Sequence, residues 1–171
     1  AYNYQDKTYD YNDCFKYVKP ILSDADFAIG NLEVTLGIKP YSGYPQFSSP
    51  ASYASAIKKA GVDVLMTANN HSCDKGKKGL EKTIQILDSL QISHTGTFIM
   101  KEEKELQSPL ILEKNGFKLA LINYTYGTNG IPPTQPNIVN YLDKEVIAKD
   151  VENARLTNPD EIIVFVHWGT Q

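Results

Sequence analysis

The sequence of 171 residues has little cysteine, no marked excess of either charge and no long apolar run. Its two cysteines are too few for a disulfide framework, and their spacing matches no zinc motif. No apolar stretch approaches the ~20 residues that a membrane-spanning helix needs. With 17 basic and 20 acidic side chains the net charge is −3, which argues against a general nucleic-acid-binding protein.

The composition that remains is that of a folded domain. Hydrophobic residues make up 42% and charged residues 22%, which excludes the disordered and collagen-like classes. A chain of this length buries roughly two thirds of its unfolded surface, so we expect one domain over residues 1–171. Strand-like and helix-like patterns alternate along the chain, which is typical of an α/β layered domain.

Apolar periodicity gives the expected elements. Helices are expected at 12–23, 51–60, 77–90 and 143–156, and strands at 27–29, 62–67, 92–96, 110–112, 119–122 and 162–166. Pro20 weakens the first helix, because a proline inside a helix removes a donor and clashes with the preceding turn. The turn 114–116 is expected to join two strands into a hairpin. The continuous apolar run 62–67 predicts a central strand that is covered on both faces.

Three of these strands end in side chains that can bind a metal or move a proton. The side chains are Asn31 and Glu33 after 27–29, Asn69, Asn70 and His71 after 62–67, and His167 after 162–166. In layered α/β domains ligands bind at the carboxyl ends of strands, so the three ends would converge if the strands are neighbours. Carboxylate, amide and imidazole groups together suit divalent metals such as Mn, Zn or Fe.

Each of these signals has a structural alternative. A strand-end histidine such as His167 is more often hydrogen-bonded structure than a ligand. Asn69 or Asn70 can cap the helix that follows, and Glu33 can be a surface turn residue. The joint occurrence on three strand ends is what favours a site.

Two further groups of side chains stand out. Lys75, Lys77 and Lys78 begin the helix expected at 77–90, where the positive end of the helix dipole disfavours cations. A bound anion would remove this conflict, and a solvated basic surface is the alternative. Five of the eleven tyrosines lie within residues 2–17, where they form either a platform for a polymer or a cover for a sheet or helix.

Four stretches of the sequence carry a family resemblance. They read DADFAIGNLEVTLG, YSGYPQFSSP, AGVDVLMTANNHSCDKGKKGLEKTIQILDSLQISHTGTF and VFVHWG. The sequence resembles the bacterial capsule-synthesis CapA family, also called poly-γ-glutamate biosynthesis proteins, along nearly all of its length. That family is similar to the calcineurin-like metallophosphoesterases. The resemblance implies a layered sandwich of mixed β-sheets flanked by helices, with two divalent metal ions held at strand ends.

The resemblance also implies roles for individual residues. Asn31 or Glu33 stands where a bridging acidic ligand would be, and Asn70 and His167 match metal ligands. His71 matches the histidine that stabilises the transition state or protonates the leaving group. We assign Asn69 and the three lysines Lys75, Lys77 and Lys78 to substrate binding.

The sequence departs from the family pattern at several points. Asn31 replaces an aspartate, Asn69 a glycine and Ser72 an acidic residue. A Gly-Asp motif is expected upstream of residue 1 and a Gly-His-x-His motif downstream of residue 171. We therefore expect residues 1–171 to be an incomplete portion of the fold with at most half of the metal site, binding metal weakly or not at all. The sequence also ends shortly after its most apolar strand, which favours an incomplete portion of the fold. The alternative is a terminal strand followed by a short tail.

Three hypotheses follow for function. The first is a metal-dependent hydrolase acting on an anionic polymer such as poly-γ-glutamate or a γ-linked peptide, with a phosphoester as the alternative substrate. The second is a non-catalytic polyanion-binding component of a capsule synthesis or export complex that includes membrane proteins. The third is an α/β domain without a site. The resemblance places the protein in the bacterial cell envelope, outside the cytoplasmic membrane, exported or anchored.

Overall fold

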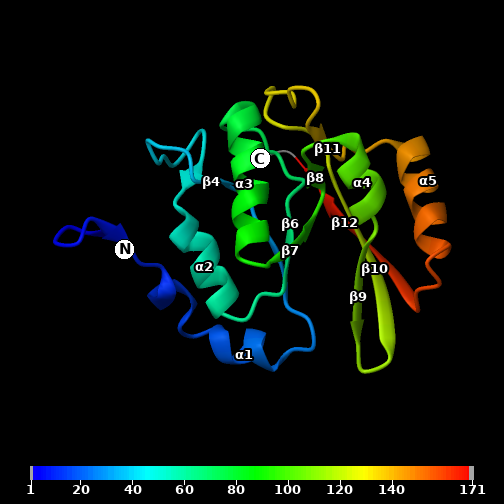
Figure 1. The fold of residues 1–171 in the computed structure, drawn as a ribbon, viewed down its shortest axis with the longest axis horizontal. Coiled ribbons are helices and arrows are strands. Elements are labelled where there is room, and N and C mark those ends of the chain that lie inside the picture. The colour runs from blue at the N-terminus through cyan, green and yellow to red at the C-terminus, as the bar shows by residue number, and fades with distance from the viewer. Residues whose placement is uncertain (1, 170–171) are drawn as a thin grey trace.

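The computed structural model describes residues 2–169, and two three-stranded sheets form its centre (Figure 1). The first sheet has the order β3-β6-β7, and all its strands are parallel. The second has the order β12-β10-β9, with β10 parallel to β12 and antiparallel to β9. The bounds are β3 Ile29–Asn31, β6 Val64–Met66, β7 Ser93–Thr95, β9 Leu110–Lys114, β10 Phe117–Thr125 and β12 Glu161–His167.

Helices flank both sheets. They are α1 (Lys19–Asp24), α2 (Ala51–Lys59), α3 (Gly76–Ser89), α4 (Lys101–Gln107) and α5 (Lys144–Arg155), with one 3-10 helix, η1 (Asn12–Phe15). Figure 1 shows α2 and α3 on the side of the first sheet and α4 and α5 on the side of the second. Three two-stranded pairs complete the fold: β1 (Tyr2–Asn3) with β2 (Thr8–Tyr9), β4 (Thr35–Leu36) with β5 (Ser48–Ser49), and β8 (Thr97–Phe98) with β11 (Ile138–Val139).

Apolar side chains hold the two sheets together. Val64 and Met66 of β6 form one buried cluster with Leu112 of β9 and Leu121 of β10. This shared cluster packs the first sheet against the second, since burial of apolar surface is the main stabilising term in such an arrangement. The expected layered α/β sandwich is therefore confirmed.

Most of the expected elements are also confirmed. The helices expected at 51–60, 77–90 and 143–156 are α2, α3 and α5, each within one or two residues of the predicted bounds. The predicted hairpin is β9–β10, in which Phe117 pairs with Lys114. The run 62–67 contains β6, which is the buried central strand of its sheet.

The single helix predicted at 12–23 is wrong, because the segment is broken into η1 and α1. Pro20 lies in the first turn of α1, where the missing N–H costs nothing. Neither helix contains a buried residue, and Val18 between them is 45% exposed. Phe15 packs against a core cluster, whereas Val18 faces solvent, so the apolar residues that suggested one continuous helix do not form one buried stripe.

The strand expected at 162–166 is β12, and despite its apolar sequence it is not buried. β12 lies at the edge of its sheet and pairs only with β10 within residues 2–169. Its apolar side chains remain accessible, with Ile163, Val164 and Val166 exposed by 36%, 38% and 45%. A run of apolar residues identifies a strand, but it does not say whether both faces of that strand are covered.

Candidate active site

The polar ends of β3, β6 and β12 meet at one place. His167 Nε2 lies 2.9 Å from Asn70 Oδ1 and 3.8 Å from Glu33 Oε1. The Asn31 amide donates a hydrogen bond of 3.0 Å to Glu33 Oε2. The predicted convergence was conditional on the three strands being neighbours, and β12 is not a neighbour of β3 or β6. The ends converge because the two sheets pack against each other.

A cavity of about 290 Å³ lies between these strand ends. Asn31 and His167 line it together with apolar side chains of both sheets, among them Met66 and Phe165. The cavity therefore joins two of the predicted metal ligands to a largely apolar wall, as is usual for small-molecule sites.

The buried amide of Asn123 fixes the spacing between the sheets. Asn123 Oδ1 accepts a hydrogen bond of 2.7 Å from the Ala68 amide, and Nδ2 donates to the Ala68 carbonyl at 3.3 Å and to the Phe165 carbonyl at 3.4 Å. One side chain thus connects the segment after β6 with β10 and β12. The sequence analysis missed this residue, although a polar side chain directly after the apolar run 119–122 was a signal for it.

Asn69 positions the site from inside the protein. Its side chain is fully buried, and Nδ2 donates to the Leu32 carbonyl at 2.8 Å and to Asn31 Oδ1 at 3.1 Å. Its Oδ1 accepts a hydrogen bond of 3.0 Å from the His71 amide. These bonds connect β3 to the turn that carries His71. The predicted contact of Asn69 with substrate stays a prediction, since these three partners are all protein atoms.

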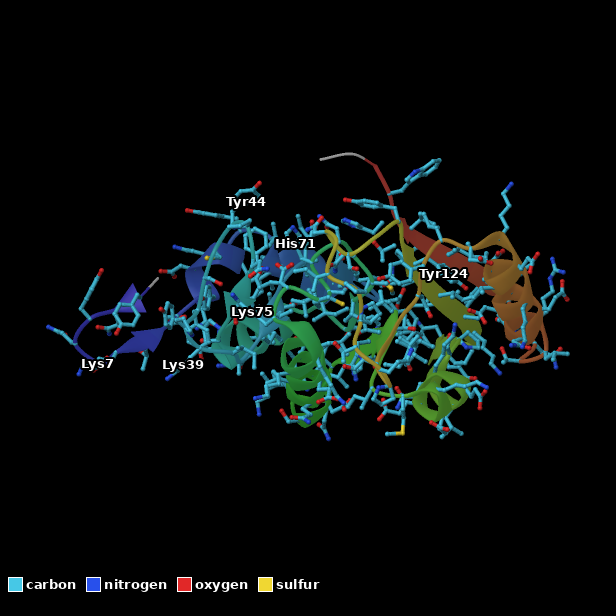
Figure 2. The ribbon with its side chains drawn as sticks, turned by 90° about the horizontal axis from the view of Figure 1, so that it is seen from above. Lys7, Lys39, Tyr44, His71, Lys75 and Tyr124 are labelled. Carbon is cyan, nitrogen blue, oxygen red and sulfur yellow. The ribbon has the colours of Figure 1, made fainter. Side chains whose placement is uncertain are left out.

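His71 is held by a carboxylate that the sequence analysis did not assign to the site. His71 Nδ1 lies 2.7 Å from Asp74 Oδ2, and both residues are buried. The same oxygen accepts a hydrogen bond of 2.6 Å from the Phe47 amide, and the Phe47 ring packs edge-on against the imidazole. The spacing of three residues within one turn was the available signal. In Figure 2, His71 and Tyr44 both lie toward the upper edge of the view.

The loop after β10 contacts both His167 and Asn70, two of the predicted metal ligands. The Tyr126 ring stacks on the His167 imidazole with centroids 6.1 Å apart and an angle of 13° between the planes. The Asn70 amide donates a hydrogen bond of 3.2 Å to Asn129 Oδ1. Neither Tyr126 nor Asn129 was predicted, because these contacts depend on how the loop folds over the strand ends.

The three lysines lie at the start of α3, as expected. Lys75 is the N-cap residue, and the first turn contains no acidic side chain. Lys77 Nζ lies 3.8 Å from Glu81 Oε1 on the same helix, whereas Lys78 is exposed. Part of the positive charge is therefore offset within the helix. Lys75 and Lys78 are the better placed of the three to attract an anion.

The donor atoms fit one divalent ion better than two. Glu33 Oε1, Asn70 Oδ1 and His167 Nε2 provide a carboxylate, an amide oxygen and an imidazole nitrogen around one point. This is a mixed nitrogen and oxygen set that Mn, Zn or Fe accepts. Within residues 2–169 there is no group of three or more His, Cys, Asp or Glu side chains that would hold a metal. A two-metal centre requires more charged ligands than this cluster has.

Residues 1–171 match the family described as bacterial capsule synthesis protein PGA_cap. The chain belongs to this family. It is 26% identical over 169 residues to the capsule biosynthesis protein CapA of Bacillus anthracis, an alignment that covers 92% of this chain and 40% of the relative. It is 24% identical over 167 residues to the PGA biosynthesis protein CapA of Bacillus subtilis (strain 168), covering 92% of this chain and 42% of the relative. The chain therefore spans less than half the length of these relatives.

A solved structure agrees with the fold of this PGA_cap family member. The NAD nucleotidase NadN of Haemophilus influenzae superposes with a TM-score of 0.51 and 22% sequence identity, over 70% of this chain and 22% of that chain. The likeness shows that this chain shares its layered α/β fold with a part of NadN. Among residues 2–169, no helix is both long and apolar enough to cross a membrane.

Proposed function

We propose that this chain supplies part of the active site of a metal-dependent hydrolase that acts on an anionic polymer such as poly-γ-glutamate during capsule biosynthesis. The observation that carries the proposal is the meeting of Glu33, Asn70 and His167 beside the His71–Asp74 pair. Asn69 joins the two parts, because it bonds both Asn31 and the His71 amide.

Glu33, Asn70 and His167 would hold one divalent ion. When bound, such an ion supplies Lewis-acid activation of water and neutralises charge that develops on a carbonyl or phosphoryl oxygen. Asn31 orients the Glu33 carboxylate through its amide hydrogen bond. The family resemblance implies a second ion. Its ligands would come from segments that correspond to the parts of the longer relatives that this chain does not span.

His71 is the proton donor in this proposal. The Asp74 carboxylate accepts a hydrogen bond from Nδ1–H, so Nε2 faces the substrate, and the protonated imidazole would give its Nε2 proton to the leaving group. A histidine held in one orientation can protonate a leaving group near neutral pH. Lys75 and Lys78 would draw the acidic polymer toward this end of the sheets.

A non-catalytic role is the second candidate, and Asn31 favours it. An asparagine in place of the family aspartate removes one negative charge from the metal site and weakens the hold on a cation. In this alternative the same strand ends bind the polymer within a capsule synthesis or export complex of membrane proteins. Both candidates place the protein in the cell envelope, outside the cytoplasmic membrane.

The deciding experiment uses a version of this chain that is extended at both ends to the length of the CapA relatives, beside the 171-residue chain. Elemental analysis gives the bound metal, and chain-length analysis of poly-γ-glutamate together with a p-nitrophenyl phosphate assay gives turnover. His71→Ala is expected to lower turnover by roughly 10²-fold or more while the metal content stays unchanged. His167→Ala is expected to lower the metal content itself. His94→Ala is the matched control, because His94 pairs with Asp88 outside the site.

One result would reject the hydrolase. Metal-loaded protein that cleaves neither substrate, yet binds poly-γ-glutamate, would support the binding role. In that case His71→Ala should leave binding intact, whereas Lys75→Glu with Lys78→Glu should weaken it in a salt-dependent way. Turnover of p-nitrophenyl phosphate alone would retain the hydrolase and replace the polymer by a phosphoester.

A further inference from the structure

The β1–β2 hairpin and the loop before α2 enclose a cavity of about 850 Å³ that shares no residue with the candidate active site. Three aromatic side chains and two cations line it: Tyr2, Tyr9, Tyr41, Lys7 and Lys39. We call these five residues the tyrosine pocket. Its volume lies in the range of sites that bind small molecules or one segment of a polymer. Figure 2 shows Lys7 and Lys39 away from His71, toward the lower left of the view.

The rings of the tyrosine pocket are held in place by other rings. Tyr9 lies 4.8 Å from Tyr2 and 5.5 Å from Tyr41, measured between centroids, and the Tyr41 contact is edge-on. Tyr9 also stacks on Tyr11 with an angle of 8° between the planes, and Tyr11 in turn packs against Tyr53 of α2 at 5.0 Å. This series connects the hairpin to the helix. The ring faces are therefore arranged before any ligand arrives, which lowers the entropic cost of binding.

The charge of the tyrosine pocket is positive. No acidic residue lines it, and within residues 2–169 neither Lys7 nor Lys39 forms an ion pair with a carboxylate. Lys39 Nζ lies 6.0 Å from the centroid of the Tyr41 ring. In a chain with a net charge of −3, two unpaired lysines beside one cavity create a local attraction for anions.

The combination of flat rings with cations selects among anionic ligands. An aliphatic polyanion such as poly-γ-glutamate can form ion pairs with the lysines, but it has no ring that could stack on an aromatic face. A pyranose ring presents its C–H groups to the electron-rich face of an aromatic ring, and its hydroxyls hydrogen-bond to tyrosine hydroxyls. A carboxylate on that sugar would pair with Lys7 or Lys39. The geometry points to an acidic saccharide, a pyranose carrying a carboxylate, as the ligand of the tyrosine pocket. This inference does not depend on the proposed hydrolase.

Calorimetric titration of the 171-residue chain with three oligomers tests the inference. Trigalacturonate carries both sugar rings and carboxylates, maltotriose carries rings without charge, and tri-γ-glutamate carries charge without rings. Trigalacturonate is expected to bind at least about tenfold more tightly than either of the others, since each lacks one of the two interactions. Its affinity should fall as salt is raised, because exposed charge pairs are screened.

Variants locate the binding. Lys7→Gln with Lys39→Gln should weaken trigalacturonate binding and remove most of its salt dependence, and these exposed changes leave the rings in place. Tyr41→Ala should weaken binding further, whereas Tyr41→Phe, which keeps the ring face, should retain most of it. The matched control is Lys16→Gln with Tyr17→Ala, since Lys16 lies 5.7 Å over the Tyr17 ring outside the pocket. The control should bind as the unchanged chain does.

Several outcomes would overturn the inference. Equal or tighter binding of tri-γ-glutamate would make the pocket a general polyanion site, and equal binding of maltotriose would remove the role of the lysines. Binding that survives the Lys7, Lys39 and Tyr41 changes would place the ligand elsewhere, and no binding of any oligomer would reject the pocket as a saccharide site. His71→Ala should leave trigalacturonate binding unchanged although it lowers turnover of the proposed hydrolase, which separates the two sites.

Discussion

His167 Nε2 lies 2.9 Å from Asn70 Oδ1, although 97 positions separate the two residues in the sequence. The contact joins the end of β12 in one sheet to the end of β6 in the other. The apolar cluster that includes Val64 and Leu121 brings the two sheets together. The candidate site therefore depends on the distance between the sheets, and the residues that set this distance are the natural first targets for mutation.

Asn123→Ala is expected to lower the free energy of unfolding by about 2 kcal/mol, because it leaves the buried Ala68 amide and carbonyl without their partners. Urea denaturation followed by circular dichroism measures this change. Asn153→Ala on the exposed face of α5 is the control and should have little effect. A loss at Asn123 no larger than that of the control would show that the sheets keep their spacing without this amide.

Gly96→Ala is expected to destabilise the fold by at least about 2 kcal/mol. Gly96 has a φ of +113°, and a Cβ there would lie 2.2 Å from Asn123 Oδ1 and 2.6 Å from the Ala68 nitrogen. Thermal unfolding of the variant checks the prediction. Gly43→Ala is the matched control, because nothing lies within 4 Å of a Cβ at Gly43. Equal melting temperatures for the two variants would contradict the crowding at Gly96.

Asp74→Asn is expected to reduce kcat of the extended version by about 10²-fold, because the amide that replaces the carboxylate does not hold the His71 imidazole with Nε2 toward the substrate. KM and metal content should change little, which distinguishes positioning from a loss of structure. The control is Asp88→Asn, which removes the His94–Asp88 pair outside the site. An unchanged kcat and pH profile for Asp74→Asn would remove the pair from the mechanism.

The two cysteines are expected to react at very different rates. Cys14 is exposed, whereas Cys73 is 1% exposed, and burial together with the nearby Asp74 raises the pKa of its thiol to about 11. Only the thiolate is nucleophilic, so Cys73 stays unreactive at pH 8 and gains reactivity only as the pH rises toward its pKa. Iodoacetamide labelling followed by mass spectrometry should modify Cys14 alone in the native chain and both cysteines in urea. Equal native rates would show that Cys73 is accessible.

Residues with a purely local signal were predicted well. The stripe of Leu80, Ile84 and Leu87 defined α3, and the turn at Asn115 and Gly116 defined the β9–β10 hairpin. Strand ends also marked Asn70 and His167 as candidates. These features depend on the period of apolar residues and on turn chemistry, which act over a few neighbouring positions.

Residues whose role depends on distant partners were missed. Asp74 belongs to the site because its carboxylate bonds His71, and Asn123 because its amide connects the two sheets. Both contacts exist only in the folded chain. The broken segment around Pro20 shows the converse, because only part of its apolar pattern, at Phe15, packs against the core.

The sequence by itself determined the helices α2, α3 and α5, the strands of the two central sheets, the family and the three polar strand ends. Tertiary structure alone decided that β12 lies at the edge of a second sheet, that His167 nonetheless reaches Asn70, and that the tyrosines near the N-terminus enclose a pocket with Lys7 and Lys39. The physical reason is the sequence separation over which each kind of interaction acts. Periodicity and turn preferences act within a few residues, whereas the packing of sheets and the pairing of buried polar groups are settled between segments that meet only in the folded chain.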